Sequence, residues 1–125
     1  MAKGKFATAI NCMDDRTQIP VIEFLKEKYG VAYVDDVTEA GPDRILDSRS
    51  HIVDSIKERV TLSVKKHDSH LIAVVGHHDC AGNPVDKEVH FRNIRDAMKR
   101  VSGWFDGVHV VGLWVDSKWA VHEIR

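Results

Sequence analysis

The sequence predicts an α/β protein in three layers, with helices on both faces of a mostly parallel sheet of four to five strands. The expected strand order is 2-1-3-4, followed by a C-terminal hairpin strand. Short apolar runs alternate with longer segments whose apolar residues recur every third or fourth position. Such alternation favours parallel strands joined by crossover helices. The chain has 125 residues, of which 43% are hydrophobic, so we expect residues 1–125 to form one domain.

The first half of the chain predicts two strands around one helix. Lys5–Asn11 is a short apolar run typical of a strand. Gln18–Tyr29 has a helical stripe of apolar residues, and Gly30 follows where a C-cap glycine belongs. Val31–Val34 is a β-branched and aromatic run, which predicts the second strand. Asp35–Asp43 contains a Gly-Pro pair and is predicted to be a loop.

The second half predicts two more helices and the remaining strands. Ser48–His67 has apolar residues at four-residue spacing and cations in its last turn, where they complement the helix dipole. Leu71–Val75 is continuously apolar, as expected for a strand buried on both faces. The rest of the prediction is a helix over Asp86–Val101, a strand over Val108–Val111, and a strand-turn-strand unit over Leu113–Val115, 116–118 and Trp119–Ile124.

Composition excludes several classes of function. The 18 basic and 19 acidic residues nearly balance and form no basic patch, so we expect no nucleic-acid partner. The longest apolar run falls far short of the roughly 20 residues that span a bilayer, so we expect no membrane insertion. The run after Met1–Lys5 is too short for a signal peptide. With only two cysteines, we expect a cytoplasmic protein whose thiols stay reduced or bind metal.

The residues with the clearest chemistry follow the first and third predicted strands. Cys12 lies in the loop Asn11–Arg16, and His77 and Cys80 form an H-x-x-C pair in the loop Gly76–Asn83. Ligands of open α/β sheets bind at the carboxyl ends of the strands, where the winding direction reverses. If the two strands are neighbours, the two sulfurs and the imidazole converge. The sequence therefore predicts a metal site.

Two thiolates and an imidazole suit zinc better than magnesium or calcium, which prefer oxygen ligands. We therefore expect one Zn²⁺ per chain, held by Cys12, His77 and Cys80. Three protein ligands leave a fourth position free, which is typical of a catalytic zinc site. Each motif is weak alone, since a single cysteine is often a small buried hydrophobe.

Asp14 and Arg16 are the candidate catalytic residues. In an extended segment they project to the same side as Cys12. Asp14 could accept a hydrogen bond from a zinc-bound water, or it could itself fill the fourth zinc position. A bidentate Arg16–Asp14 pair would hold the carboxylate away from the metal. Alternatively, these residues only begin a helix, with Asp15 or Thr17 as the N-cap.

With these motifs the sequence resembles the β-class carbonic anhydrases. The C-x-D-x-R of Cys12, Asp14 and Arg16 and the H-x-x-C of His77 and Cys80 match the two signatures of that family in order. Softer matches are the segments 39–41 and 110–112, and the resemblance covers roughly positions 4–124. Glu39 stands where the family has asparagine, and Ala81 stands where it has glycine.

The resemblance implies zinc held by Cys12, His77 and Cys80, with Asp14 and Arg16 as the catalytic dyad. It implies that zinc-bound hydroxide attacks CO2 to give bicarbonate, which makes the protein a lyase. It also implies a homodimer or higher homo-oligomer with a small-molecule substrate. Alternatives on the same site are hydrolysis of carbonyl sulfide or carbon disulfide, and a non-catalytic zinc-binding module in which Asp14 is the fourth ligand. A metal-free redox or nucleophilic cysteine protein is a further alternative.

The remaining candidates have two interpretations each. Gly41 could place backbone amides near the dyad and the substrate, as the resemblance suggests, or only form the turn before Pro42. His78 and Asp79 could be solvent-facing loop residues or could contact the metal ligands and relay protons. His90 is predicted to lie on the surface. The three tryptophans are predicted to pack in the core or a subunit interface rather than around a substrate: Trp104, Trp114 and Trp119.

Overall fold

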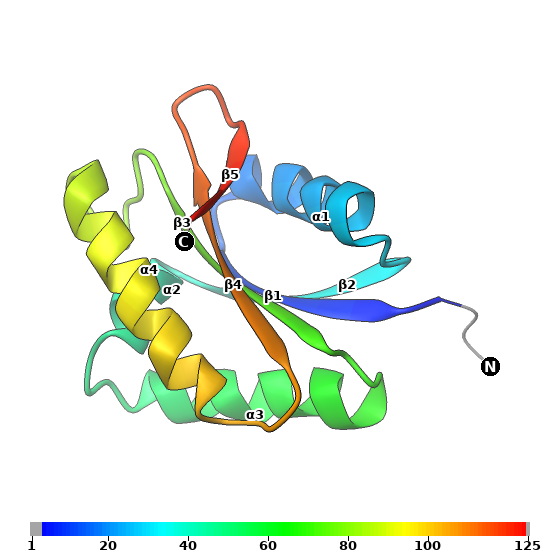
Figure 1. The fold of residues 1–125 in the computed structure, drawn as a ribbon. Coiled ribbons are helices and arrows are strands. Elements are labelled where there is room, and N and C mark those ends of the chain that lie inside the picture. Colours follow the sequence, from blue (N-terminus) through cyan, green and yellow to red (C-terminus); the bar gives the residue numbers. More distant parts are fainter. Residues whose placement is uncertain (1–3, 125) are drawn as a thin grey trace.

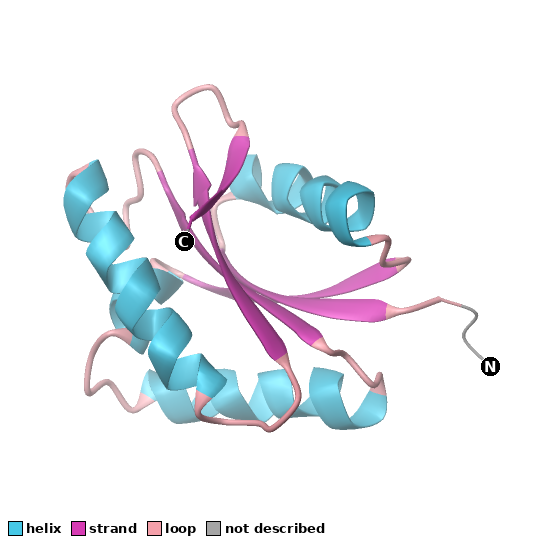
Figure 2. Ribbon diagram, in the orientation of Figure 1, coloured by secondary structure: helices cyan, strands magenta, loops and turns pink. Residues whose placement is uncertain are grey.

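A five-stranded sheet forms the centre of the computed structural model, which describes residues 4–124 (Figures 1 and 2). Its order is β2-β1-β3-β4-β5, and only the β4–β5 pair is antiparallel. The predicted fold class and strand order are therefore confirmed. The strands are β1 (Phe6–Cys12), β2 (Tyr33–Glu39), β3 (Leu71–His77), β4 (His109–Val115) and β5 (Val121–Ile124).

Helices cover both faces of this sheet, as Figure 1 shows. Helix α1 (Asp15–Tyr29) lies on one face. Helices α2 (Pro42–Leu46), α3 (Ile52–Lys66) and α4 (Lys87–Ser102) lie on the other. Among residues 4–124, no helix combines the length and the apolar character needed to cross a membrane.

Strand β3 separates two hydrophobic clusters. Leu71, Ala73 and Val75 pack in the cluster beneath α1, whereas Ile72 and Val74 pack in the cluster beneath α3 and α4. Successive strand residues point to opposite faces, so a strand covered on both sides must be apolar throughout. The uninterrupted apolar run places β3 at the centre of the molecule and holds His77, its last residue, in a rigid position.

Strand β2 differs from its prediction. The predicted strand Val31–Val34 begins and ends too early, because β2 runs from Tyr33 to Glu39. The predicted loop Asp35–Asp43 is therefore wrong, since it contains most of β2 and the start of α2 at Pro42. Every residue of β2 pairs with β1, from Tyr33 opposite Phe6 to Glu39 opposite Cys12. As an edge strand it leaves most side chains partly exposed, so its polar composition resembles that of a loop.

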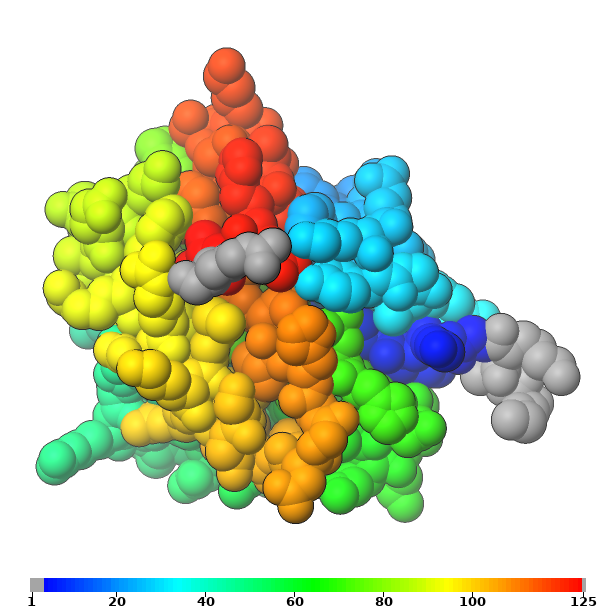
Figure 3. All heavy atoms as spheres, viewed as in Figure 1, coloured from blue at the N-terminus to red at the C-terminus, as the bar shows by residue number. Residues whose placement is uncertain are grey.

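The C-terminal strands also differ in detail. The predicted separate strands Val108–Val111 and Leu113–Val115 form one strand, β4, that runs through Gly112. A Cβ at Gly112 would lie 2.6 Å from the Met98 sulfur, so the glycine marks a close approach of α4 rather than a break. The β4–β5 hairpin projects at the top of the space-filling view, in orange and red (Figure 3). The hairpin begins where β3 ends, because His77 pairs with Val115, the last residue of β4.

Candidate metal centre

Three potential metal ligands meet at the carboxyl ends of β1 and β3. Cys12 ends β1, His77 ends β3, and Cys80 follows one turn later. The three residues are buried, and their ligand atoms all lie within 4.8 Å of one another. Neighbouring parallel strands bring them together, because β1 and β3 pair directly. The predicted convergence is therefore present in the structure.

The geometry of these residues fits a zinc ion. The sulfurs of Cys12 and Cys80 lie 3.9 Å apart, close to the ~3.8 Å that two Zn–S bonds of about 2.3 Å at a tetrahedral angle require. The Nδ1 proton of His77 is donated to the His78 carbonyl oxygen at 2.7 Å. The buried Nε2 atom has no hydrogen-bond partner among the described residues. A lone pair on Nε2 is therefore free to bind a metal.

The two neighbouring thiols differ in how readily they ionise. A hydrogen bond from Cys80 lowers the pKa of Cys12 to about 4 despite burial, with further help from His77 and the Gly41 backbone. The pKa of Cys80 is raised, first because its thiol proton is held in the hydrogen bond to Cys12. Burial of the thiol and the negative charge of Cys12 act in the same direction. Burial opposes ionisation of His77, but the Cys12 thiolate and the His78 carbonyl raise its pKa above the ordinary value. A divalent cation would supply the positive charge that this cluster attracts.

Asp14 and Arg16 form a bidentate ion pair next to this cluster. Arg16 Nε donates to Asp14 Oδ1 at 3.0 Å, and a terminal guanidinium nitrogen donates to Oδ2 at 2.7 Å. The guanidinium lowers the pKa of Asp14 to about 2, so the carboxylate stays ionised at neutral pH. Asp14 also caps α1, because its Oδ1 accepts the Arg16 backbone N–H at 3.0 Å.

This start of α1 corrects two expectations. The N-cap is Asp14, rather than Asp15 or Thr17. The segment after Cys12 is not extended, because α1 begins at Asp15 and Arg16 lies in its first turn. The ion pair forms nevertheless, since the long Arg16 side chain folds back onto the cap. An N-terminal carboxylate is also favoured there by the helix dipole.

A small cavity of about 230 Å³ opens beside the candidate metal ligands. Its lining residues come from the loops after β1, β2 and β3: Cys12, Met13, Asp14, Ala40, Ala81 and Gly82. The apolar side chains among them are Met13, Ala40 and Ala81. The cavity is therefore small and largely apolar, and the side chains of Cys12 and Asp14 form part of its wall.

The loops after β2 and β3 contact each other through bare backbone. A Cβ at Gly82 would lie 2.4 Å from the Ala40 carbonyl carbon, and one at Gly41 would lie 2.6 Å from the Gly82 carbonyl carbon. Gly41 also has φ +66°, a left-handed conformation that favours glycine. This contact sets the distance between the loop that carries Cys80 and the end of β2. Gly41 thus shapes the site through its backbone as well as forming the turn.

Other candidates lie elsewhere than predicted. The surface position predicted for His90 is wrong, because the residue is buried and its Nδ1 lies 2.6 Å from Asp43 Oδ2. The buried face of α4 runs through His90 and Ile94. Spacing by four from Ile94 is the signal that could have found it. His78 is exposed, which agrees with its interpretation as a solvent-facing loop residue.

Two contacts of Arg16 were not predicted, although Asp79 was already a candidate for contact with the metal ligands. Asp79 accepts hydrogen bonds from the guanidinium through Oδ2 and its carbonyl oxygen at 3.3 and 3.2 Å. The ring of Trp119 stacks on the same guanidinium. Trp114 is buried in the core, and Trp104 packs against it, as predicted. The sequence contains no local signal for the Trp119 contact, which joins opposite ends of the chain.

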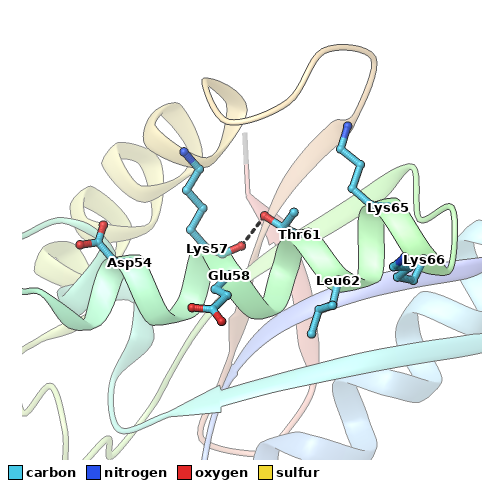
Figure 4. Close-up of a pocket in the computed structure, with 7 residues that line it drawn as sticks. All are labelled: Asp54, Lys57, Glu58, Thr61, Leu62, Lys65 and Lys66. Carbon is cyan, nitrogen blue, oxygen red and sulfur yellow. Dashed lines mark hydrogen bonds between the residues drawn. The ribbon is translucent and has the colours of Figure 1, made fainter.

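A separate hollow of about 490 Å³ lies on the outer face of α3 (Figure 4). Its side chains are mostly charged, and Leu62 among them is 57% exposed. The Thr61 hydroxyl donates back to the Lys57 carbonyl oxygen at 2.6 Å, so this polar group is already paired within the helix. The hollow shares no residue with the metal centre and has the character of a solvated helix face.

The sequence matches a family model described as "Putative carbonic anhydrase" over residues 2–125. A comparison with curated protein sequences finds no match.

Solved carbonic anhydrases share the fold. The enzyme from Streptococcus mutans superposes with a TM-score of 0.64 at 18% identity, covering 95% of this chain and 81% of that chain. β-Carbonic anhydrase isoform I from the protozoan Trichomonas vaginalis gives 0.60 at 16% identity, with 99% and 85% covered. A tetrameric β-carbonic anhydrase from the ascomycete Sordaria macrospora gives 0.56 at 16% identity, with 96% and 80% covered. At these identities the superpositions establish a common fold.

Proposed function

The chain belongs to the carbonic anhydrase family whose model it matches along its length, and from this premise we propose that it catalyses the reversible hydration of carbon dioxide to bicarbonate. The observation that carries the proposal is the buried Cys12–His77–Cys80 cluster with a free imidazole nitrogen, beside an ionised Asp14 held by Arg16. Both halves of the constellation are needed for a zinc lyase of this type, and both lie at the carboxyl ends of β1 and β3.

In this proposal Cys12, His77 and Cys80 hold one Zn²⁺ per chain. Bound zinc would act as a Lewis acid that lowers the pKa of a water molecule towards 7. Cys12 and Cys80 bind as thiolates, and His77 binds through Nε2 while Nδ1 keeps its proton on the His78 carbonyl. That second hydrogen bond fixes the ring orientation and its tautomer.

Asp14 orients the attacking water in this proposal. Its low pKa keeps the carboxylate an acceptor across the neutral range, so it can receive a hydrogen bond but does not hold the proton. Arg16 engages both carboxylate oxygens, which limits the rotation of Asp14 and adds positive charge beside the site. This pairing argues against the non-catalytic module, because a ligating Asp14 would have to give up part of its contact with Arg16.

The cavity beside Cys12 supports a small uncharged substrate. Its volume of about 230 Å³ and its Met13, Ala40 and Ala81 lining suit a linear triatomic molecule. Carbon dioxide meets this description, and so do carbonyl sulfide and carbon disulfide. Substrate competition distinguishes them: we expect carbon dioxide to be turned over with the highest kcat/KM.

We further propose that the chain works as a homodimer or higher homo-oligomer in the cytoplasm. Two large apolar side chains near the site support an interface, since Met13 is 63% and Ile19 is 62% exposed. The free thiols of Cys12 and Cys80 support a reducing compartment, in which metal ligation is not lost to oxidation. Sedimentation analysis would test the assembly, and a fractionation experiment would test the location.

Stopped-flow hydration of carbon dioxide at about pH 8.5 tests the central proposal. We expect the zinc-loaded protein to exceed an Asp14→Ala variant by about 100-fold in kcat, the scale of a lost acid–base or orienting group. Asp15→Ala is the matched control, because Asp15 is an exposed acid on the same helical turn. Equal rates for the wild-type protein and Asp14→Ala, at equal zinc content, would refute the proposal.

A further inference from the structure

The Arg16 guanidinium is held from a third direction by the β4–β5 hairpin. Its central carbon lies 4.4 Å from the centroid of the Trp119 ring, well within the range of a cation–π contact. The Arg16 side chain is 44% exposed. The ring therefore covers part of a guanidinium that also remains in contact with solvent.

Trp119 occupies a backbone position that does not suit it. Its φ is +63°, in the left-handed region that bulky residues rarely enter. The preceding turn is closed by Trp119 N–H, which donates to the Asp116 carbonyl at 2.9 Å. In hairpins of this kind the left-handed residue after the turn is usually glycine. A tryptophan here is costly to the backbone, which points to a role for its ring.

The position of the ring shows what that role can be. Besides Arg16, its neighbours are the His77 imidazole, with centroids 6.3 Å apart, and the hydrophobic cluster beneath α1. The cluster holds the ring from below, so the ring is a fixed surface rather than a mobile flap. It touches Arg16 and lies close to a metal-ligand candidate, but it does not line the small cavity beside Cys12.

Arg16 has a second carboxylate acceptor on the opposite loop. Asp79 Oδ2 accepts from one terminal nitrogen at 3.3 Å, and the Asp79 carbonyl accepts from the other at 3.2 Å. Both contacts are longer than the 2.7 Å bond to Asp14 Oδ2. Asp79 is exposed and also has a positive φ, of +57°. A guanidinium with two carboxylates in reach needs a further constraint to stay bidentate on one of them.

We propose that Trp119 is a positioning residue: its ring stacks on the Arg16 guanidinium and keeps that group bidentate on Asp14 instead of shifting to Asp79. The assignment rests on the proposed function for its catalytic consequence. The contacts themselves belong to the metal-free chain, so they can be measured without turnover. The hairpin is then part of the active site, although its sequence contains no catalytic motif.

Three variants separate the ring from the backbone and the packing. Trp119→Phe keeps an aromatic face, Trp119→Leu keeps apolar bulk alone, and Trp119→Asn suits the left-handed backbone without a ring. Lys118→Ala is the matched control on the same turn, because Lys118 is exposed and only its backbone N–H is bonded there. Urea unfolding verifies that each variant is folded.

The first measurement is hydrogen exchange of the Arg16 Nε–H by ¹H–¹⁵N NMR in the metal-free protein. We expect slow exchange in the wild type, in Trp119→Phe and in Lys118→Ala, because Nε donates to Asp14 Oδ1. We expect exchange about two- to fivefold faster in Trp119→Leu and Trp119→Asn, the factor that corresponds to an exposed cation–π contact. Unchanged exchange in both ring-free variants would overturn the proposal.

The second measurement is kcat for carbon dioxide hydration at equal zinc content. We expect a loss of about two- to fivefold in Trp119→Leu and Trp119→Asn, with rescue in Trp119→Phe. Wild-type kcat in the ring-free variants, despite faster Nε–H exchange, would also overturn the catalytic part of the assignment. If the wild type itself shows no hydration, the proposed function fails, and the exchange data alone still decide whether Trp119 positions Arg16.

Discussion

Asp14 combines two roles in a single carboxylate. As the N-cap of α1 it accepts the Arg16 backbone N–H, and as an ion-pair partner it accepts two bonds from the same residue's guanidinium. Because each interaction favours the ionised form, both lower its pKa. The local sequence Asp-Asp-Arg therefore builds a fixed, charged acceptor from residues only two positions apart.

Asp36 shows the opposite electrostatic environment. Burial in β2 raises the pKa of its carboxyl from 3.8 to about 6, and Oδ1 has no partner among the described residues. The unfolded chain ionises this group near pH 4, whereas the folded chain resists ionisation until about pH 6. Folded protein therefore binds more protons than unfolded protein in that interval, and Asp36 reduces stability as pH rises through it.

We expect Asp36→Asn to remove this penalty. Its free energy of unfolding should exceed that of the wild type by about 2 kcal/mol at pH 8 and differ little at pH 4. Urea unfolding at the two pH values measures the difference. Asp106→Asn is the control, because Asp106 is exposed. This substitution should change the free energy of unfolding little at either pH. A gain that is the same at pH 4 and pH 8 would show that desolvation of the charge is not the cause.

At the scale of elements, the site depends on where two loops touch. The loop after β3 carries Cys80, and it lies against the end of β2 through the Gly82–Ala40 and Gly41–Gly82 backbone contacts. Asn83, at the end of the same loop, donates to Asn93 of α4 at 3.1 Å. Rigid elements on both sides thus position Cys80, a candidate ligand that itself lies in a loop.

Substitution of Gly82 tests this contact. We expect Gly82→Ala to lower the free energy of unfolding by about 2 kcal/mol, because its Cβ would overlap backbone that cannot rotate away. Zinc affinity should fall as well, since Cys80 would move relative to Cys12. The measurements are urea unfolding and zinc titration.

Gly103→Ala is the matched control for Gly82→Ala. Gly103 has a helical φ of −78°, and a Cβ there would meet the Arg100 carbonyl oxygen at 3.4 Å, an ordinary contact. Its stability should be equal to or slightly above that of the wild type. Equal stability and equal zinc affinity for both variants would mean that the loop contact does not hold Cys80.

At the scale of the whole molecule, the sheet brings chemistry from both ends of the sequence to one edge. Parallel pairing of β1 with β3 joins Cys12 to His77 and Cys80, and the hairpin after β4 adds Trp119. Ionisation of both buried thiols is unfavourable without a cation, because the pKa of Cys80 is raised beside Cys12. Metal binding should therefore stabilise the entire fold.

Removal of zinc tests that coupling. At free zinc about 100 times the Kd, binding contributes about 2.7 kcal/mol, which corresponds to a rise in Tm of about 10 °C for a domain of this size. Differential scanning calorimetry with and without a chelator measures it. Cys80→Ser should show a much smaller shift. If zinc binds stoichiometrically and the Tm of the wild type does not change, metal binding is not coupled to folding.

The sequence alone determined the central part of this protein. Local hydrophobic periodicity marks β1, α1, α3, β3 and α4, because burial on one face or two imposes it residue by residue. It also identified Cys12 and His77 at the ends of two buried strands, and the Asp14–Arg16 pair. These features depend on near neighbours, so spacing along the chain contains the information.

Only the tertiary structure decided the features that depend on distant contacts. Strand β2 is polar because it is an edge strand, and His90 is buried because it pairs with Asp43, 47 positions away. Arg16 meets Asp79 across 63 positions and Trp119 from the last hairpin. Side-chain packing between elements sets these contacts, and no local pattern encodes which elements will meet. The candidate metal ligands could thus be predicted from motifs, whereas the contacts of Arg16 with Asp79 and Trp119 could not.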